Sequence, residues 1–311
     1  MIESRKAGTS RAESVASVAA LLKLARPQQW VKNTVVLAGV VFAEMADQPL
    51  AVVEALIALV AFILASASIY VFNDIRDADA DRHHPLKRSR PIAAGTVSPQ
   101  TAARYSILLG LGAAFLGTAV TPLLGLIIVG YLAMMVAYTL WLKRVAILDV
   151  TVIAVGFVLR AVGGAVAVAV PISPWLLVCA FLLALFLGFG KRRAELIGLG
   201  GTASRHRLSL QGYTEPLLDQ LVGITAFSAL VTYTIYTIVS SSVPKNDTML
   251  FTVPLVAFAI FRYLYLVYGR SLGGSPESLL FRDRWLLASV VLWGALALVI
   301  MSGDWVTGLL P

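Results

Sequence analysis

Charge is scarce in this sequence. Only 14% of the 311 residues are Asp, Glu, Lys or Arg, whereas 59% are hydrophobic and the mean hydropathy is +0.84. A soluble globular domain has about a quarter charged residues and about half apolar ones. The shortage of charge therefore excludes an ordinary soluble protein and indicates an integral membrane protein.

Cysteine and a cleavable leader are lacking as well. The single cysteine, Cys179, lies inside an apolar run, so there is no disulfide framework, and we interpret it as a small core side chain. Residues 1–14 are polar and basic, and no short apolar region with a small-residue cleavage site follows them. We therefore expect no cleaved signal peptide, and insertion through the transmembrane segments themselves.

Long apolar runs fill the rest of the chain. A helix needs about 20 apolar residues to cross about 30 Å of hydrocarbon, and runs of this length favour helices over a barrel. We predict an all-α integral membrane fold, a bundle of nine transmembrane helices. The predicted spans are 31–46, 50–72, 100–119, 121–142, 147–170, 172–190, 218–241, 249–269 and 285–307.

The remaining segments complete a single membrane domain over residues 1–311. We expect a polar N-terminal tail at 1–14 and an interfacial amphipathic helix at 15–30. Two long polar loops, 73–99 and 191–217, are expected to form the active site. The sequence gives no oligomeric state.

The basic residues fall in alternate loops. Of the 25 Lys and Arg residues, 22 lie in the N-terminal segment or in loops that would share its side of the membrane. The positive-inside rule therefore predicts a cytoplasmic N-terminus and an extracytoplasmic C-terminus in the cell inner (plasma) membrane, with the active site facing the cytoplasm. Because topology explains the net charge of +8, we expect no nucleic-acid partner.

The loop at residues 73–95, NDIRDADADRHHPLKRSRPIAAG, is the most polar stretch of the chain. In a helix, Asn73, Asp77 and Asp81 stand at i, i+4 and i+8 and follow one face with a drift of about 40° per step. Mg²⁺ prefers such oxygen ligands and keeps part of its water shell. We interpret these three residues as its ligands; the alternative is a solvated acidic helix end.

Cations follow the aspartates closely. Arg82, Lys87 and Arg90 stand within reach of any anion that the metal holds, which argues against a plain acidic helix end. Asp74 and Asp79 would point away from the metal. The loop therefore predicts a magnesium-bound diphosphate at the mouth of the bundle.

A second set of polar residues surrounds the start of the predicted span 147–170. Tyr138 and Lys143 are candidate contacts to phosphate or lipid head group, although topology alone would also explain the lysine. Asp149 lies about one turn inside the span, where an unpaired carboxylate is unfavourable by roughly a few kcal/mol. We expect it to pair with a loop cation or a substrate hydroxyl. Arg160, at mid-span, should face a polar cavity or a carboxylate on another helix.

Two more polar clusters flank the same end of the bundle. Lys191 and Arg192, in the run KRR after the predicted span 172–190, can neutralise a diphosphate. Arginine suits bidentate phosphate contacts and lysine serves as a point charge, although basic residues are also expected at a membrane boundary without such a role. Lys23 and Gln28, before the first span, are further candidate contacts to phosphate or lipid head group.

These motifs together resemble the UbiA superfamily of intramembrane prenyltransferases over nearly the whole chain. The signature of that superfamily is NxxxDxxxD in the loop after the second helix, and Asn73, Asp77 and Asp81 match it. A Tyr and a Lys before the fifth helix are matched by Tyr138 and Lys143. The resemblance implies a UbiA-like bundle and Mg²⁺-dependent chemistry on a diphosphate.

The chain departs from the superfamily at one position. The usual members carry a second acidic motif, DxxxD, after the sixth helix, where the spacing here reads KxxxE from Lys191 to Glu195. A lysine removes a ligand and places a positive charge where a second ion would lie. With NDIRDADADRxHPxKRxRPIAAG and RPxQWxKN, this variant resembles the bacterial decaprenyl-phosphate (polyprenyl-phosphate) 5-phosphoribosyltransferase branch.

That resemblance implies a pentosyl transfer. A polyprenyl phosphate would attack C1 of 5-phosphoribosyl 1-pyrophosphate (PRPP), releasing pyrophosphate and giving polyprenyl-phosphoryl-5-phosphoribose, a precursor of cell-wall arabinan donors in arabinogalactan synthesis. Asp77 and Asp81 would act through Mg²⁺ on the leaving pyrophosphate. Asp149 would bind ribose hydroxyls or steady an oxocarbenium-like ribose.

Two other classes of protein stay open. An aromatic prenyltransferase of the UbiA type, using a prenyl diphosphate, would require a second acidic motif, where this chain has Lys191. A transporter or a structural membrane protein would not need clustered aspartates and cations at one mouth.

Overall fold

The computed structural model of the chain is almost wholly helical. It describes residues 18–42, 45, 47–83, 87–199, 208–270 and 273–301, and structural statements about the chain concern these residues. The predicted tail at 1–14 lies outside them. A helix over residues 18–25 falls within the predicted interfacial segment.

Eight helical segments in the described part of the chain are long and apolar enough to cross a membrane. The first four lie within residues 49–167 and the other four within residues 174–301. They are α3 (Pro49–Arg76), α5 (Pro99–Val120), α6 (Pro122–Leu140), α7 (Leu148–Ala167), α8 (Pro174–Leu199), α10 (Glu215–Val239), α11 (Val253–Arg270) with the preceding 3-10 turn η5 (Thr248–Thr252), and α13 (Arg284–Met301).

Short elements join these helices. Three of the long helices begin at a hydroxyl cap, Ser98, Thr121 or Thr214, which accepts from the backbone N–H three residues later. A proline follows at the first or second helical position, where it suits the backbone. The connecting elements are α4 (Ala78–Arg82), η2 (Leu142–Arg144), η4 (Leu208–Gly212) and α12 (Pro276–Arg282).

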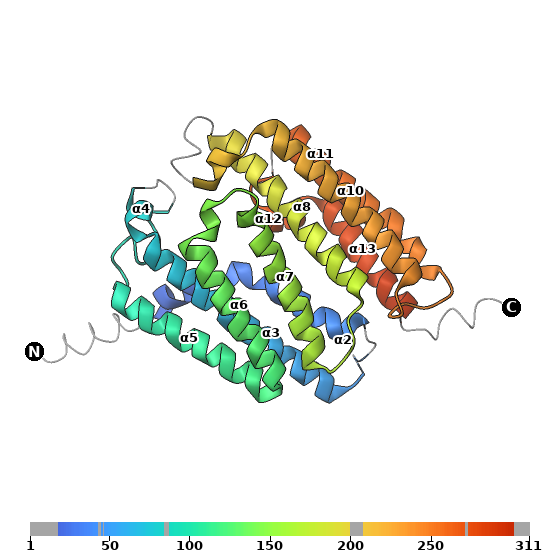
Figure 1. Cartoon of the computed structure of the whole chain (residues 1–311), viewed down its shortest axis with the longest axis horizontal. Helices are drawn as coiled ribbons and strands as arrows, with labels where there is room; N and C mark the ends of the chain where they lie inside the picture. The colour runs from blue at the N-terminus through green and yellow to red at the C-terminus, as the bar shows by residue number, and fades with distance from the viewer. Residues whose placement is uncertain are drawn as a thin grey trace, which may run out of the picture.

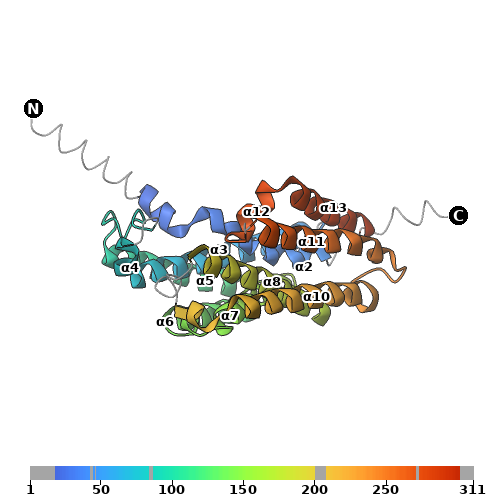
Figure 2. The same cartoon turned by 90° about the horizontal axis from the view of Figure 1, so that it is seen from above.

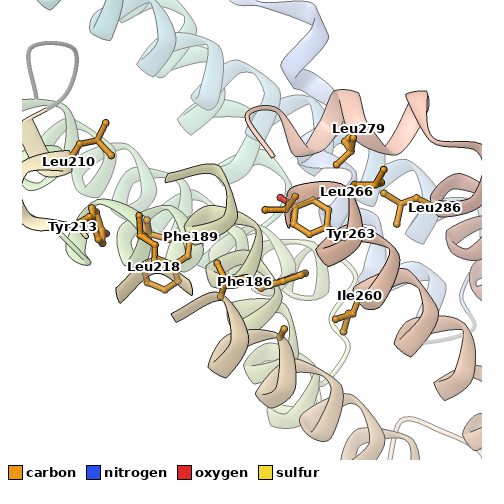
Figure 3. Packing of buried hydrophobic residues seen from close by; sticks show 14 residues of the cluster. Phe186, Phe189, Leu210, Tyr213, Leu218, Ile260, Tyr263, Leu266, Leu279 and Leu286 are labelled. Atoms are coloured by element: carbon orange, nitrogen blue, oxygen red, sulfur yellow. The ribbon is translucent and has the colours of Figure 1, made fainter. Parts of the chain in front are cut away.

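The helices form two groups, with α8 between them (Figure 1). One apolar cluster joins α3, α5, α6 and α7, and includes Phe62, Leu124 and Tyr131. The other joins α8, α10, α11 and the start of α13, with Phe186 and Tyr263 at its centre (Figure 3). Helix α8 packs against both α7 and α10. Seen from above, α11 and α13 lie on the opposite face of the molecule from α6, α7 and α10 (Figure 2).

The prediction of nine α-helical spans differs from the structure at residues 31–46. In place of one helix, the chain forms a 3-10 helix, η1 (Pro27–Leu37), and the five-residue α2 (Ala38–Phe42). A 3-10 helix has three residues per turn, so every third side chain shares a face. Asn33 and Val36 are buried on that face.

Glycines allow η1 and α2 to pack directly on the backbone of α7. A Cβ on Gly164 would lie 1.8 Å from the carbonyl oxygen of Val36, and one on Gly39 would lie 2.9 Å from the backbone of Ala165. The chain before η1 reaches the C-terminal end of α3, where Arg26 pairs with Asp74. The segment after α2 leads to the N-terminal end of the same helix. Together, η1 and α2 therefore run along α3 in the opposite direction.

Candidate active site

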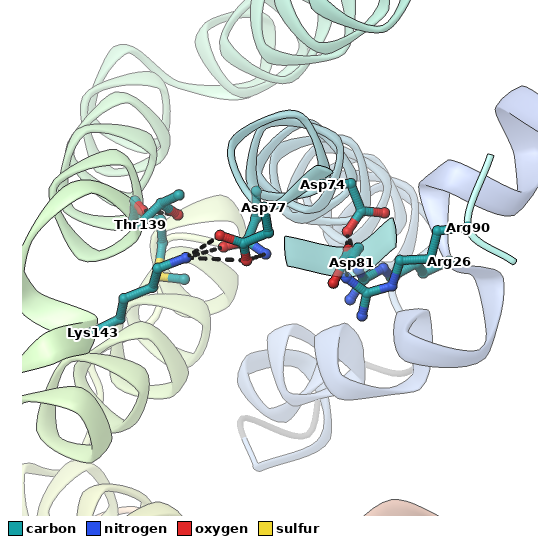
Figure 4. A network of polar contacts seen from close by, with 9 residues as sticks. Arg26, Asp74, Asp77, Asp81, Arg90, Thr139 and Lys143 are labelled. Carbon is teal, nitrogen blue, oxygen red and sulfur yellow. Dashed lines mark hydrogen bonds and ion pairs between the residues drawn. The ribbon is translucent and has the colours of Figure 1, made fainter. Parts of the chain in front are cut away.

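Polar residues gather at the end of the bundle where α3, α6 and α8 end and α7 and α10 begin. We call this the polar end. Most of the residues singled out in the sequence lie there, in three groups: around Asp77, around Asp81, and around Asp149 (Figure 4 shows the first two).

The first group joins α3 to the turn after α6. The amide of Asn73 donates to Asp77 Oδ2 at 2.8 Å. The ammonium of Lys143 lies 3.0 Å from Asn73 Oδ1, 2.9 Å from Asp77 Oδ1 and 3.2 Å from Asp77 Oδ2. The Asp77 side chain is 34% exposed, so solutes can reach this group. The predicted proximity of Asn73, Asp77 and Lys143 is thus present in the structure.

The second group lies on another face of α3. Arg90 donates to Asp81 Oδ2 at 2.6 Å and to Asp74 Oδ1 at 3.0 Å, and Arg26 also binds Asp74 Oδ1. Asp74 and Asp81 are both 3% exposed. We expected Asp74 to point away from the metal. It is instead a buried part of the polar end.

A break in the helix explains why Asp81 leaves the face of Asn73 and Asp77. The i, i+4, i+8 pattern requires one continuous helix, but α3 ends at Arg76 and Asp77 adopts φ −96° and ψ 3° before α4 begins. The change of direction carries Asp81 to Arg90. Asp79 stays exposed, as expected, and pairs with Arg82 at 2.8 Å.

The donor set at Asn73 and Asp77 fits a hard divalent cation. Three oxygens from an amide and a carboxylate converge on one cationic atom, Lys143 Nζ, and Mg²⁺ takes this kind of oxygen with water and phosphate completing its shell. In the described residues, no group of three or more His, Cys, Asp or Glu side chains is arranged as a metal site. The predicted third ligand, Asp81, is bound to Arg90 instead.

The third group is centred on Asp149, at the start of α7. Its carboxylate is fully buried and accepts from Arg192 Nε at 2.7 Å, Ser209 Oγ at 2.9 Å and Tyr213 OH at 2.8 Å. Of the two partners that the sequence left open, the cation is the one observed. These three side chains bind the carboxylate in the structure, and its contact to ribose hydroxyls stays a prediction.

The hydroxyl of Tyr213 connects this group to the backbone. It accepts from the N–H of Ile147 at 2.6 Å while donating to Asp149. Burial and the neighbouring Asp149 carboxylate raise the pKa of Tyr213 above its usual value of 10.0. The tyrosine therefore serves as a neutral donor at physiological pH.

The KxxxE motif turns inward at Arg192. This residue is 3% exposed and binds Glu195 Oε2 at 2.7 Å in addition to Asp149. Its guanidinium also lies within electrostatic range of Tyr138. Lys191 is half-buried at the same end of α8. The remaining carboxylate of this motif is thus paired with arginine.

Arg160 lies deeper in the bundle. It donates from Nε to Asn33 Oδ1 at 2.7 Å, from Nη1 to the carbonyl of Gly156 at 2.8 Å and from Nη2 to Tyr131 OH at 2.7 Å. Asn33 also donates to Ser66 at 3.2 Å. The contacts that hold this arginine come from neutral groups on η1, α6 and α7, so they tie the 3-10 segment to the bundle.

The other predicted contacts lie at the edge of the polar end. Lys23 donates to the carbonyl of Ser89 at 3.0 Å and so joins the 18–25 helix to the loop that carries Arg90. Lys87 is half-buried and Gln28 is exposed. None of these positions conflicts with a role in binding phosphate.

Two residues of the polar end were missed in the sequence. Ser209 and Tyr213 lie 60 and 64 residues beyond Asp149, in a segment with no motif of its own. Arg193, the third cation of the run KRR, has other partners than Arg192. It packs over the ring of Tyr268 at 4.1 Å and binds Asp219 Oδ1 at 2.5 Å.

Sequence comparison places these residues among known proteins. The profile of the UbiA prenyltransferase family matches residues 34–195. The chain is 36% identical over 282 residues to the decaprenyl-phosphate phosphoribosyltransferase of Mycobacterium tuberculosis, covering 89% of this chain and 92% of that protein. It is 34% identical over 288 residues to the protein of the same name from Mycolicibacterium smegmatis, with 89% and 90% coverage.

Structure comparison gives the same fold. A UbiA homolog from Archaeoglobus fulgidus bound to GPP and Mg²⁺ superposes with a TM-score of 0.72 at 18% identity, over 91% of this chain and 99% of that chain. The same homolog bound to DMAPP and Mg²⁺ gives a TM-score of 0.71 at 17% identity, with the same coverage.

Proposed function

Because the chain belongs to the UbiA prenyltransferase family, we propose that it is a polyprenyl-phosphate 5-phosphoribosyltransferase. It transfers 5-phosphoribose from PRPP to a polyprenyl phosphate such as decaprenyl phosphate, and it releases pyrophosphate. The relatives named decaprenyl-phosphate phosphoribosyltransferase support this assignment, since they match over nine-tenths of their length.

One structural observation favours this reaction over prenyl transfer to an aromatic ring. Arg192 binds both Asp149 and Glu195, so cationic side chains and their partners fill the place of the second acidic motif. Two metal ions on a prenyl diphosphate need carboxylates that are free to bind them. A soluble sugar diphosphate that is held by one metal ion and by lysine or arginine does not need this second set of carboxylates.

The residues of the polar end have separate roles in this proposal. Asn73 and Asp77 would hold Mg²⁺, with Asp81 as a further candidate ligand. The bound ion supplies Lewis-acid stabilisation of the leaving pyrophosphate. Lys143, Lys191 and Arg90 contact its phosphates, with Arg82, Lys87, Lys23 and Gln28 around them.

The acceptor needs orientation more than it needs a base. A phosphate monoester is already anionic at neutral pH, so no proton has to be removed before it attacks C1. Asp149 therefore acts as a positioning residue: it fixes Arg192 and the start of η4, and through them the end of α8 that carries Lys191. Tyr138 lies beside this assembly. Arg160 has a structural role deeper in the bundle, where it ties η1 to α6 and α7.

The membrane topology completes the proposal. Because η1 and α2 run opposite to α3, we propose that they form a ninth crossing in 3-10 and short helical form. The polar end then faces the cytoplasm, where PRPP arrives, and the C-terminus lies outside. The protein is a multi-pass component of the bacterial inner membrane, and its product feeds cell-wall arabinan synthesis.

A substrate comparison tests the proposal. Purified protein in detergent is given Mg²⁺, polyprenyl phosphate and PRPP labelled in the ribose, and in parallel a prenyl diphosphate with an aromatic acid. Label should enter the lipid fraction in the first reaction. Product in the second reaction with none in the first would replace this function by aromatic prenyl transfer.

A further inference from the structure

The Lys143 ammonium contacts the oxygens of Asn73 and Asp77 that would hold a metal ion. It lies 2.9 to 3.2 Å from three of these oxygens. A cation that binds Asn73 and Asp77 therefore has to displace this ammonium.

The other aspartates of the same loop are neutralised as well. Asp74 is bound by Arg26 and Arg90, Asp79 by Arg82, and Asp81 by Arg90. A divalent cation arriving alone thus meets no uncompensated carboxylate at this site. It would leave the Lys143 ammonium without its anionic partner, at a position where the side chain is 22% exposed and only partly solvated.

A diphosphate changes this balance. It brings oxygens that the displaced ammonium can bind, and an ammonium close to phosphate gains a charge-assisted contact. Arg90 can likewise exchange Asp81 for a phosphate as its partner. When metal and diphosphate bind together, Lys143 and Arg90 exchange a carboxylate partner for a phosphate partner, so neither cation is left unpaired.

We propose that Lys143 is an exchangeable counter-ion that couples the two binding events: it neutralises Asp77 in the empty site and moves to the diphosphate when the metal binds. The metal on its own binds weakly, and each of the two ligands raises the affinity for the other. This inference rests on the proposed function for a diphosphate substrate, whichever group that diphosphate carries.

Binding of Mn²⁺ to the purified protein in detergent tests the coupling without catalysis. Free Mn²⁺ is followed by electron paramagnetic resonance, with and without inorganic pyrophosphate, and corrected for the complex that the two form in solution. Allosteric couplings are commonly about 5- to 150-fold, and we expect pyrophosphate to tighten Mn²⁺ binding by about tenfold or more in the wild-type protein. Lys143→Met should bind Mn²⁺ alone about tenfold more tightly than wild type and lose most of the coupling.

The sign of the change in Lys143→Met is decisive. A lysine that merely contacts phosphate would leave the affinity for Mn²⁺ alone unchanged when it is replaced, and unchanged or weaker binding would overturn the proposal. Arg144→Met is the matched control, because it removes the adjacent exposed cation, and it should leave both affinities as in wild type. Lys143→Arg keeps the charge and should retain weak binding of Mn²⁺ alone.

Thermal unfolding of each variant identifies any that fail to fold. For a Lys143→Met that does not fold, Lys143→Gln replaces it with the same expected sign. A protein that transfers a prenyl group instead of ribose would still show the coupling, since both donors are diphosphates. Failure of the proposed function and failure of this inference are therefore separate results.

Discussion

Asp149 and Arg192 form a buried ion pair between α7 and α8. Arg192 Nε lies 2.7 Å from Asp149 Oδ2, and the Arg192 side chain is 4% exposed and that of Asp149 0%. Removing one member of such a pair leaves a buried charge unpaired. The loss of stability is then large, although the pair itself contributes little net stability.

A double-mutant cycle on this pair tests the positioning role. Asp149→Asn should destabilise the fold by about 3 kcal/mol because it leaves Arg192 with Glu195 alone. Combining it with Arg192→Gln should recover part of that loss, with a coupling energy of about 1–3 kcal/mol. Thermal unfolding in detergent gives the stabilities, and initial rates with labelled PRPP give the activities. Activity that stays lost while stability returns would place one of these residues in contact with the substrate.

Asp77→Asn should abolish phosphoribosyl transfer while the fold stays intact. The substitution removes the charged ligand of the proposed metal, and a loss of at least about a hundredfold corresponds to a few kcal/mol of transition-state stabilisation. Asp79→Asn is the control, because Asp79 is exposed and faces Arg82. A near-normal rate in Asp77→Asn would remove the metal role.

Lys191→Asp restores an acidic residue at the first position of the second motif. If Lys191 contacts the diphosphate, the reversal of charge should weaken PRPP binding by about tenfold or more, which is about 1.4 kcal/mol. Equilibrium binding of labelled PRPP measures this directly. The exposed Arg88, changed to Asp, provides the same change of net charge elsewhere in the polar end. Equal effects from both variants would indicate a general electrostatic field, with no direct contact.

Tyr131→Phe tests whether Arg160 supports the fold. The substitution removes the 2.7 Å hydrogen bond to Arg160 Nη2, and a hydrogen bond to a charged group contributes about 1.5–3 kcal/mol. We expect a loss of stability in that range, measured by thermal unfolding, and a nearly unchanged KM for PRPP. A raised KM at unchanged stability would assign Arg160 to the substrate.

Tyr213 predicts an alkaline limit to stability. Burial and Asp149 raise its pKa above 10.0, whereas in the unfolded chain it titrates near its usual value of about 10. Its contribution is therefore complete below about pH 10 and is lost as the pH rises toward the folded pKa. The difference in unfolding free energy between wild type and Tyr213→Phe should be constant from pH 7 to about 9 and narrow above that. A difference that stays constant above pH 10 would contradict this contribution of Tyr213.

The sequence predicts which residues lie at the polar end better than it predicts the contacts between them. Asn73, Asp77 and Lys143 meet as expected, because a helix fixes the first two and the positive-inside pattern places the third on the same side. The predicted helical register is wrong beyond Asp77. The sequence ADADR can continue a helix or start a new one, and its residues do not distinguish the two.

Long-range partners lie beyond what residue patterns can predict. Asp149 contacts Ser209 and Tyr213 because α7 packs on α8 and η2 lies against η4. Likewise, the apolar content of residues 31–46 predicts a span but not its helix type. That type depends on Gly164, whose missing side chain lets the Val36 carbonyl approach.

The contacts of η1 also have a consequence for biosynthesis. Asn33 depends on Arg160, which lies 127 residues further along the chain, and Val36 depends on Gly164. Until α7 has been translated, Asn33 lacks its Arg160 partner and the Val36 carbonyl lacks its place beside Gly164. We therefore expect η1 to dock only after α7 has entered the bilayer.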